Sequence, residues 1–357
     1  MKVLQIIDGT SFGGIAKLML DIRNNISSDI KIDFLTQVPI YEENIKNVIN
    51  IDSNRKTLIG KIRYNHRLFK LLKNDKYDIV HINSSVFLFS FQVSLICKMC
   101  GIKHIIAHSH SNTYVSKFRK IIIKVLTPIY NKMIKCKLSC SKSSASKLFI
   151  KTDDVIYVKN GINIDKFKYN KKIRDEYRKK YNVDDKIVYG TVGRIDRLKN
   201  HNFLIDLFYE IQNKETNAVL FVLGTGSLEN KIKEKVKLLK IADKVKFLGF
   251  RDDVNNLLNM MDIFLFPSLS EGIGISLIEA QTSGLPAVVY KNIPKEANIS
   301  NNFYILDSFN VNDWISKIKN IKFSKRESAY KCAIKNGYDI RKTSKQLEKI
   351  YNDLLLK

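Results

Sequence analysis

Short apolar segments recur along the first half of the chain, and segments with helical periodicity lie between most of them. The helical patterns include Ile15–Asn25 and Lys61–Lys73. The expected strands are Lys2–Ile7, Ile32–Thr36, Ile79–Ile82, His104–Ala107, Lys137–Cys140 and Val155–Val158. Strands that alternate with helices predict a parallel sheet whose connections are crossover helices.

The same alternation begins again in the second half of the chain. The expected strands are Ile187–Val192, Ala218–Val222, Val245–Phe247, Ile263–Phe266 and Ala287–Val289, and the expected helices include Phe203–Gln212, Leu228–Lys240 and Ser276–Ser283. A second parallel sheet with its own helices is therefore predicted. The fold class is α/β, with two Rossmann-like, doubly wound domains.

The boundary between these domains is expected in the polar, highly charged segment Lys166–Lys186. We predict a first domain over residues 1–168 and a second over residues 169–340. In the remaining tail, residues 341–357, the spacing of the apolar side chains predicts an amphipathic helix; these side chains are Leu347, Ile350, Tyr351 and Leu354. A chain of 357 residues that is 45% apolar is long enough to form two cores.

Nothing in the apolar pattern predicts a signal peptide or a membrane span. The N-terminal apolar segment is short and ends at Asp8, as in a buried strand. The longest apolar stretch, Val86–Cys97, is interrupted by Ser90, Gln92 and Ser94, and it is too short to cross a bilayer. Five cysteines, an odd number, fit a reducing compartment. We therefore expect a cytoplasmic protein.

The net charge of +26 is distributed unevenly. From Ile79 to Thr152 there are twelve Lys or Arg residues and no Asp or Glu. Such a one-sided segment favours an anionic partner, which can be nucleic acid, anionic lipid or a phosphorylated substrate. Within it, Lys117–Lys137 interleaves lysines with apolar residues, which predicts a basic amphipathic helix that Pro128 kinks or divides. Such a helix can lie on an anionic membrane, or its apolar stripe can pack on the first sheet while the lysines stay solvated.

The segment Glu271–Glu279 carries the most informative chemistry of the second half. It follows the strand Ile263–Phe266, and Gly272 and Gly274 allow backbone N–H groups to approach a ligand closely. A helix is expected to begin near Ser276, and a helix N-terminus attracts phosphate oxygens. Ser276 and Glu279 also have the spacing of a capping box, which would be a purely structural arrangement.

Two further loops follow strands of the second half. Gly193 ends a strand and places Arg194 and Lys199 at its carboxyl end, where ligands bind in doubly wound sheets and where two cations can hold a diphosphate. A solvated, charged loop is the alternative interpretation of that segment. Gly224 and Gly226 follow the next strand, although turns use glycine freely.

The first half offers a glycine loop and a pair of histidines. Gly13 and Gly14 follow the first strand, as a phosphate loop or as a tight turn. His108 and His110 end a strand on the same face, where imidazoles can contact sugar hydroxyls. No third ligand accompanies them, and no Asp-x-Asp motif is present, so we expect no metal site; the pairs Cys97–Cys100 and Cys136–Cys140 are too far apart in sequence to predict zinc binding.

Together these segments resemble the retaining nucleotide-sugar glycosyltransferases of family four, which have the GT-B fold, and the resemblance covers essentially the whole chain. Its most specific part is the E-x7-E spacing of Glu271 and Glu279. The other matching segments are Ala280, Gly284-Leu285-Pro286, Gly193-Arg194 with Lys199-Asn200, Asn160-Gly161-Ile162 and Gly13-Gly14. The family implies an acceptor-binding and a donor-binding domain that face a central cleft, with a C-terminal helix that crosses back to the first domain.

The resemblance also implies a role for each matching residue. Arg194 and Lys199 would bind the donor diphosphate, Glu271 would contact the transferred sugar, and Glu279 would bind the ribose. The remaining donor-binding positions are Gly13, Gly14, Gly193, Gly224, Gly226, Gly272, Gly274, Ile275 and Ser276. His110, or the adjacent His108, would contact the sugar near the reacting carbon. Ile273 stands where many relatives have Phe, which leaves the sugar preference open.

The family retains the anomeric configuration and needs neither a metal nor a cofactor. Residues Ile293–Ala297 look like the branch that builds bacterial capsules and exopolysaccharides. The expected partners are therefore a nucleotide-sugar donor, a saccharide or lipid-linked acceptor and an anionic membrane surface, with the enzyme at the inner face of the membrane. The donor sugar, its nucleotide, the acceptor and the oligomeric state remain open at this point.

Three other classes of protein share some of these features. A sugar-phosphate synthase is the nearest enzymatic alternative, since it has the same fold. A NAD-dependent oxidoreductase would show a GxGxxG motif after its first strand, which Gly13-Gly14 does not provide. A basic protein that binds nucleic acid or membrane without catalysis would explain the charge, but no motif for reading or stacking bases is present, and we expect no nucleic-acid partner.

Overall fold

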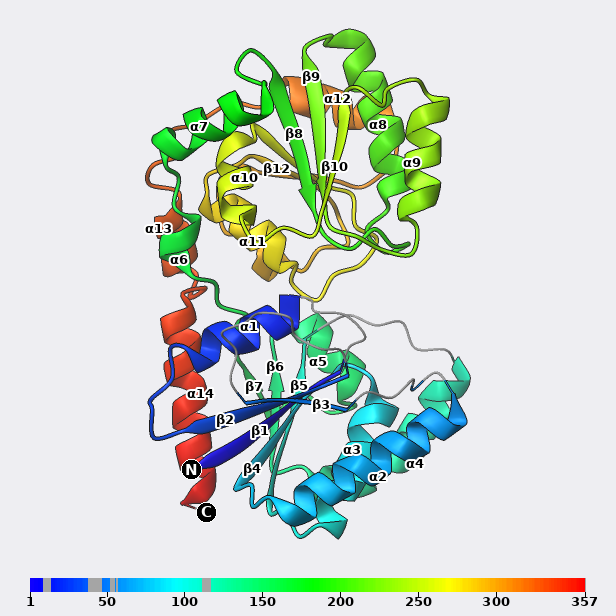
Figure 1. Cartoon of the computed structure of the whole chain (residues 1–357), viewed down its shortest axis with the longest axis vertical. Helices are drawn as coiled ribbons and strands as arrows, with labels where there is room; N and C mark the ends of the chain where they lie inside the picture. The colour runs from blue at the N-terminus through cyan, green and yellow to red at the C-terminus, as the bar shows by residue number, and fades with distance from the viewer. Residues whose placement is uncertain (9–13, 38–46, 52–54, 56, 111–116, 357) are drawn as a thin grey trace. The chain divides into compact units, whose positions relative to one another are not determined.

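The computed structural model describes residues 1–8, 14–37, 47–51, 55, 57–110 and 117–356. The chain divides into two compact units (Figure 1). Unit 1 contains Met1–Gly161 together with Ile340–Lys357, and unit 2 contains Ile162–Asp339. No helix among the described residues combines the length and the apolar character needed to cross a bilayer.

Unit 1 is built on a parallel sheet whose strands are ordered β3-β2-β1-β4-β5-β6-β7. The strands are β1 (Lys2–Ile7), β2 (Lys31–Thr36), β3 (Val48–Asn50), β4 (Ile79–Asn83), β5 (His104–Ser109), β6 (Cys136–Ser139) and β7 (Val155–Tyr157). Most residues of the central strands are buried, as expected for a sheet covered on both faces.

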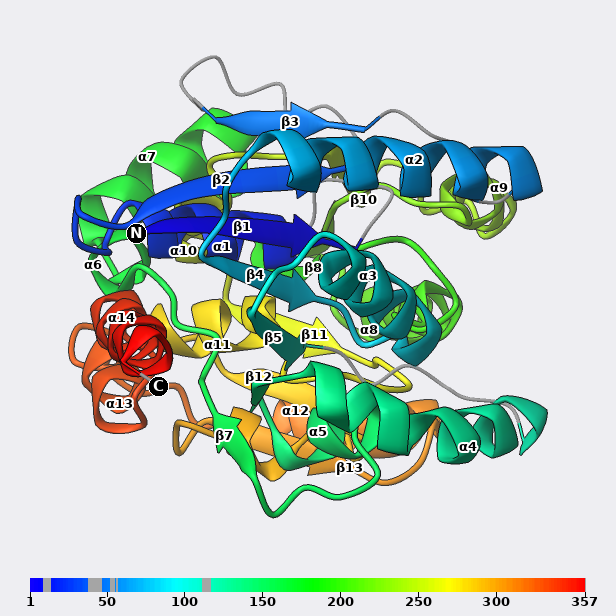
Figure 2. The same cartoon turned by 90° about the horizontal axis from the view of Figure 1, so that it is seen from below.

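Helices cover both faces of this sheet. On one face, α2 (Leu58–Asn74), α3 (Phe87–Met99) and α4 (Lys117–Met133) lie side by side, as Figure 2 shows. On the other face, α1 (Gly14–Arg23) packs against the C-terminal helix α14 (Ile340–Leu355). The short helix α5 (Lys142–Leu148) contacts β5 and β6. Pro128 lies inside α4, so the helix is not divided there.

Unit 2 repeats this architecture with a parallel sheet ordered β10-β9-β8-β11-β12-β13. Its strands are β8 (Ile187–Val192), β9 (Ala218–Leu223), β10 (Val245–Gly249), β11 (Ile263–Phe266), β12 (Ala287–Tyr290) and β13 (Phe303–Leu306). The two edge elements β3 and β13 were not expected from the sequence. Both are short and largely unburied, so neither has the continuous apolar run of an inner strand.

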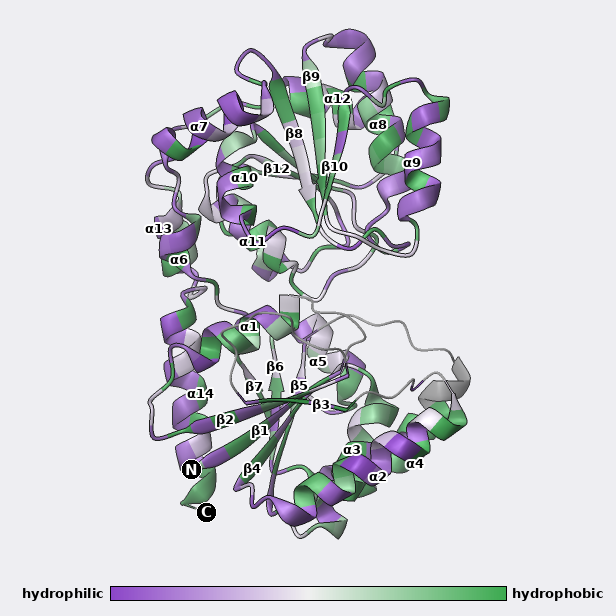
Figure 3. Ribbon diagram, in the orientation of Figure 1, coloured by the Kyte–Doolittle hydropathy of each residue, from purple (hydrophilic) through white to green (hydrophobic). Residues whose placement is uncertain are grey.

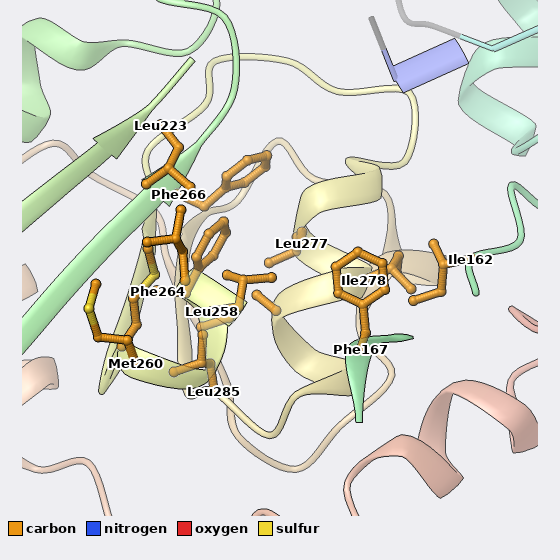
Figure 4. Close-up of a cluster of buried hydrophobic side chains, with 14 of the residues drawn as sticks. Ile162, Phe167, Leu223, Leu258, Met260, Phe264, Phe266, Leu277, Ile278 and Leu285 are labelled. Atoms are coloured by element: carbon orange, nitrogen blue, oxygen red, sulfur yellow. The ribbon is translucent and has the colours of Figure 1, made fainter. Parts of the chain in front are cut away.

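Two cores sandwich the sheet of unit 2. One is formed with α8 (His201–Lys214), α9 (Glu229–Leu238) and α12 (Val311–Lys319), and it contains the fully buried Trp314. The other is formed with α6 (Ile164–Phe167), α7 (Lys171–Tyr181), α10 (Val254–Met260), α11 (Ile275–Thr282) and α13 (Tyr330–Lys335). Figure 4 shows part of this second core, in which Phe264 and Phe266 of β11 lie close to Leu277 of α11.

The boundary between the units lies after Gly161, rather than after residue 168 as the sequence predicted. The reason is that Ile162, Ile164 and Phe167 are buried in the core of unit 2. The backbone N–H of Ile162 also donates a 2.8 Å hydrogen bond to the Tyr338 carbonyl. The tail does form the amphipathic helix that its apolar spacing predicts, and the Ser344 hydroxyl on this helix donates a 3.3 Å hydrogen bond to the Ile22 carbonyl of α1.

Candidate functional site

The segments with the strongest chemical signal in unit 2 follow neighbouring strands of its sheet. Gly193 follows β8, Gly224 follows β9, and the loop 267–274 leads from β11 to α11. These strands are parallel and adjacent, so their carboxyl ends meet at one edge of the sheet. Ligands of doubly wound domains bind at this edge.

At this edge, Lys199 and Glu271 form an ion pair. Their Nζ and Oε1 atoms are 2.5 Å apart, and the side chains are only 19% and 11% exposed. The Lys199 ammonium group also lies 4.7 Å from the ring centroid of Phe266, where a cation is attracted to the aromatic face. The structure therefore brings together two residues that the sequence assigned to the same site.

Arg194 differs from Lys199 because its side chain is 67% exposed. It forms a 3.3 Å ion pair with Asp196, a residue whose importance the sequence analysis missed. Asp196 Oδ1 accepts hydrogen bonds from the backbone N–H groups of Leu198 (2.9 Å) and Lys199 (3.2 Å). An aspartate side chain that accepts from the backbone two residues later is typical of an Asx turn, and here the turn holds the backbone of Lys199 in place.

The first turn of α11 is attached directly to the end of β8. The helix begins at Ile275, after Gly274, whose φ of +74° favours glycine. Ser276 lies within the first turn, and its hydroxyl donates a 3.0 Å hydrogen bond to the Val192 carbonyl. The capping box considered for Ser276 and Glu279 is therefore wrong, because Gly274 occupies the N-cap position. Glu279 is 6% exposed, and Gly272 is buried in the loop before the helix.

Gly224 and Gly226 have a structural task that the sequence did not indicate. A Cβ atom on Gly224, whose φ is +119°, would collide with the Gly193 carbonyl oxygen. A Cβ atom on Gly226 would collide in the same way with the backbone of Ile195. Backbone hydrogen bonds join the two loops, including Ile195 N–H to the Thr225 carbonyl at 3.0 Å. The two glycines therefore allow the loops after β8 and β9 to lie directly against each other.

One further residue beside this edge has no hydrogen-bond partner within the described part of the chain. His201 is 3% exposed and both of its ring nitrogens are without a partner. Burial and the nearby Lys199 charge lower the pKa of His201 to about 4. This imidazole is therefore neutral at neutral pH, and it places no second cation beside Lys199.

In unit 1, the two predicted histidines belong to a larger buried group. His108 and His110 are 1% and 4% exposed, and their ring centroids are 3.8 Å apart. His81 on the adjacent strand β4 is fully buried, and its Nε2 atom is 3.1 Å from His108 Nδ1. The sequence did not point to His81, although it lies on β4, the parallel neighbour of the strand β5 that carries His108. Burial is the main reason that the pKa values of all three are lowered, to about 3 for His81 and about 4 for His110.

Amide side chains and a tyrosine complete this group. His110 Nε2 lies 3.0 Å from Asn83 Oδ1, and His110 Nδ1 lies 3.1 Å from Asn160 Oδ1. The Asn83 amide donates a 2.6 Å hydrogen bond to Gln5 Oε1. The Tyr351 hydroxyl of α14 lies 2.7 Å from His81 Nδ1.

Of the predicted glycine loop, Gly14 is the exposed first residue of α1, and Gly13 lies outside the described residues.

The outer surface of the α2–α3–α4 layer combines apolar and basic side chains. The three helices contain no acidic residue. The exposed large apolar side chains on the layer are Leu58, Ile59 and Ile62 of α2, Val86, Leu88, Leu95 and Met99 at α3, and Ile121, Val125 and Ile129 of α4. The exposed basic side chains include Lys61, Arg63, Arg67, Lys98, Lys124 and Lys132. Figure 3 shows both hydrophilic and hydrophobic residues along α2 and α4.

Helix α4 is apolar on two sides. Tyr130 and Met133 face the core, while Ile121, Val125 and Ile129 form an exposed stripe at intervals of four residues. One side of the helix therefore packs into the core of unit 1, and the exposed apolar stripe lies on another side. Lys137, which was grouped with these lysines, belongs instead to β6. Its side chain is 9% exposed and forms a 2.8 Å ion pair with Asp154.

No group of three or more His, Cys, Asp or Glu side chains in the described part of the chain is arranged to hold a metal ion.

Comparison with known proteins identifies similar chains. Residues 173–339, which make up most of unit 2, match the family model described as glycosyl transferases group 1. The putative glycosyltransferase EpsF of Bacillus subtilis (strain 168) is 25% identical over 98% of this chain and 96% of its own length. The UDP-Gal:alpha-D-GlcNAc-diphosphoundecaprenol alpha-1,3-galactosyltransferase of Escherichia coli is 25% identical over 81% of this chain and 79% of its own. Among solved structures, HepE of Anabaena in complex with UDP-glucose has a TM-score of 0.79 at 16% identity and covers 99% of this chain and 100% of its own.

Proposed function

The chain is a group 1 glycosyltransferase with the GT-B fold, and we propose that it transfers a sugar from a nucleotide-sugar donor to a saccharide or lipid-linked saccharide with retention of the anomeric configuration. The transfer would contribute to a surface polysaccharide. Support for this pathway comes from relatives such as the capsular polysaccharide biosynthesis glycosyltransferase CapH of Staphylococcus aureus, 27% identical over 82% of both chains.

The observation that carries the proposal is the Lys199–Glu271 ion pair at the carboxyl edge of the unit 2 sheet. A donor diphosphate needs cations, and a sugar needs hydrogen-bond acceptors for its hydroxyl groups. The pair supplies one of each within a largely buried setting. The ion pair also holds the Glu271 carboxylate in a fixed orientation until a donor arrives.

The remaining donor contacts follow from the arrangement around this pair. Arg194 is exposed, so it is able to turn from Asp196 toward the diphosphate as negative charge develops on the leaving group. The backbone N–H groups of Gly272, Gly274, Ile275 and Ser276 lie at or before the N-terminus of α11, which favours phosphate oxygens. Glu279, one helical turn later, binds the ribose hydroxyls. Gly193, Gly224 and Gly226 shape the loops beside the nucleotide.

In unit 1, His108 or His110 contacts the transferred sugar. Both are neutral at neutral pH because burial lowers their pKa values, so either can donate one hydrogen bond without adding a charge. We assign no metal to the reaction, because Arg194, Lys199 and the helix N-terminus together offset the charge of the leaving diphosphate.

The test of this function is a pair of acceptor assays with the purified protein. Transfer from a panel of UDP- and GDP-sugars is measured to undecaprenyl diphosphate sugars and, separately, to sugar phosphates. The proposal predicts transfer to the lipid-linked acceptor. Transfer to a sugar phosphate alone would instead support the sugar-phosphate synthase of the same fold.

The proposed partner of the α2–α3–α4 layer is an anionic membrane surface at the cytoplasmic face. Its exposed apolar side chains are able to enter the lipid interface, while the surrounding lysines and arginines attract anionic headgroups. Each cation near such a surface contributes about 1 kcal/mol at low ionic strength. Attachment there would bring unit 1 close to an acceptor that is anchored in lipid.

Sedimentation with vesicles tests this attachment. The protein is expected to bind vesicles that contain phosphatidylglycerol, to leave neutral vesicles unbound, and to dissociate at high salt. Replacement of Ile121, Val125 and Ile129 by Ser should weaken binding, whereas Leu238→Ser, at an 82% exposed position of unit 2, should not. Equal behaviour with both kinds of vesicle would contradict the proposal.

A further inference from the structure

A buried chain of hydrogen bonds connects the C-terminal helix to His108 inside unit 1. The Tyr351 hydroxyl lies 2.7 Å from His81 Nδ1, and His81 Nε2 lies 3.1 Å from His108 Nδ1. All three side chains are at most 1% exposed. This series of hydrogen bonds therefore starts on α14, passes through β4 and ends on β5.

The positions of the protons on Tyr351, His81 and His108 follow from the Gln5 side chain, which lies at the start of this series of hydrogen bonds. The Gln5 amide donates a 2.6 Å hydrogen bond to the Tyr351 oxygen, so the proton of the phenol is directed to His81 Nδ1. A neutral His81 that accepts at Nδ1 carries its own proton on Nε2. That proton is donated to His108 Nδ1. Because burial lowers the pKa of His108 well below its usual value, His108 is also neutral and carries its proton on Nε2.

The series of hydrogen bonds ends at the Nε2–H group of His108. This N–H group is buried, and it has no hydrogen-bond partner within the described residues. A buried N–H group without a partner is costly, so its retention in a fold needs a reason. The neighbouring His110 differs, because both of its ring nitrogens already face an amide side chain. Of the two histidines, His108 is the one that keeps a donor for a ligand.

We propose that Tyr351 and His81 are positioning residues that hold His108 in the Nε2–H tautomer, so that this N–H donates a hydrogen bond to an oxygen atom of a bound saccharide. The inference rests on the proposed function and deepens it. It selects His108 over His110 as the contact, and it gives the C-terminal helix a role in the reaction as well as in packing.

The experiment compares wild-type protein with His81→Gln, His81→Leu and Tyr351→Phe. The glutamine amide keeps a donor close to the position of His81 Nε2, whereas leucine removes it. Proteins labelled with ¹⁵N-histidine are examined by NMR, which distinguishes the two tautomers of His108 without any substrate. Turnover is measured with whichever of UDP-glucose, UDP-galactose and UDP-N-acetylglucosamine the wild-type protein consumes.

We expect the Nε2–H tautomer of His108 in the wild-type protein and in His81→Gln. In His81→Leu this tautomer should no longer predominate, and kcat should fall about tenfold, the equivalent of one hydrogen bond, with little change in KM. His81→Gln should keep kcat within about threefold of the wild-type value. Tyr351→Phe should have the smaller effect, since the Gln5 amide lies 3.2 Å from His81 Nδ1 and is able to donate in place of the phenol.

Two results would overturn the inference. One is a wild-type His108 that carries its proton on Nδ1. The other is an unchanged tautomer in a His81→Leu variant that still loses turnover, because His81 would then act only through packing. Thermal unfolding of each variant checks that unit 1 remains folded. A wild-type protein that consumes no nucleotide sugar would contradict the proposed function, while the tautomer would still be read from the NMR spectrum.

Discussion

Lys199 Nζ and Glu271 Oε1 lie 2.5 Å apart, although 72 positions separate the two residues in the sequence. If the pair acts as one unit on the donor, the effects of removing its members should not add. We expect Lys199→Met and Glu271→Gln each to lower kcat by roughly 10²-fold, as for the loss of one preorganised electrostatic contact. The double variant should be only slightly worse than either single variant.

A matched control for this pair is Lys233 with Glu229 on α9, which are 2.6 Å apart on the surface of the same unit. Lys233→Met should leave turnover within about twofold, because exposed ion pairs contribute little. Strictly additive losses in the Lys199 and Glu271 variants would contradict a shared role.

Arg194 should act later in the reaction than Lys199, because its side chain is 67% exposed and pairs with Asp196. Arg194→Ala is expected to lower kcat by roughly 10²-fold as charge on the leaving diphosphate loses its partner. Arg197→Ala, an exposed arginine in the same loop, serves as the control and should change kcat little. Steady-state kinetics measures kcat and KM separately. A variant at Arg194 with normal kcat and only a higher KM would show that the residue binds the donor without assisting departure.

Gly224 should tolerate no side chain. Its φ of +119° disfavours other residues, and a Cβ atom would strike the Gly193 carbonyl oxygen. Gly101→Ala gives the matched control, because Gly101 has a φ of +80° but open space around it. We expect Gly101→Ala to cost about 1–2 kcal/mol of unfolding free energy. Gly224→Ala should cost about 1–3 kcal/mol more, measured by urea unfolding. Equal losses would mean that the two loops do not need this close approach.

Stability should decrease with acid because of the buried histidines. The pKa values of His81 and His110 are lowered from 6.5 to about 3 and about 4, so these residues are neutral in the folded protein while an unfolded chain takes up protons below pH 6.5. Each contributes a loss of about 1.4 kcal/mol per pH unit as pH falls from about 6.5 toward its folded value. Urea unfolding at pH 7 and pH 5 should show this loss. His81→Gln should reduce the slope.

The sequence predicted the inner strands well, because runs such as Ile187–Val192 and Ile263–Phe266 are buried on both sides and have no competing interpretation. It did not predict how side chains distant in sequence would meet. The contact between Tyr351 and His81 joins residues 270 positions apart, and it depends on where α14 packs. The capping box at Ser276 failed for a local reason, since Gly274, in a left-handed conformation, places the N-cap two positions before Ser276.

A thermal-shift titration of the wild-type protein and Glu271→Gln with nucleotide sugars, carried out in EDTA, tests whether the protein binds a nucleotide-sugar donor without a metal ion. A ligand that binds only the folded state stabilises it by about 2.7 kcal/mol at a hundredfold excess over its Kd. We expect at least one UDP- or GDP-sugar to raise the Tm of the wild-type protein without a metal ion. Glu271→Gln should respond to the free nucleotide but gain less from the attached sugar. A wild-type protein that no nucleotide sugar stabilises, or that responds only after magnesium or manganese is added, would contradict this expectation.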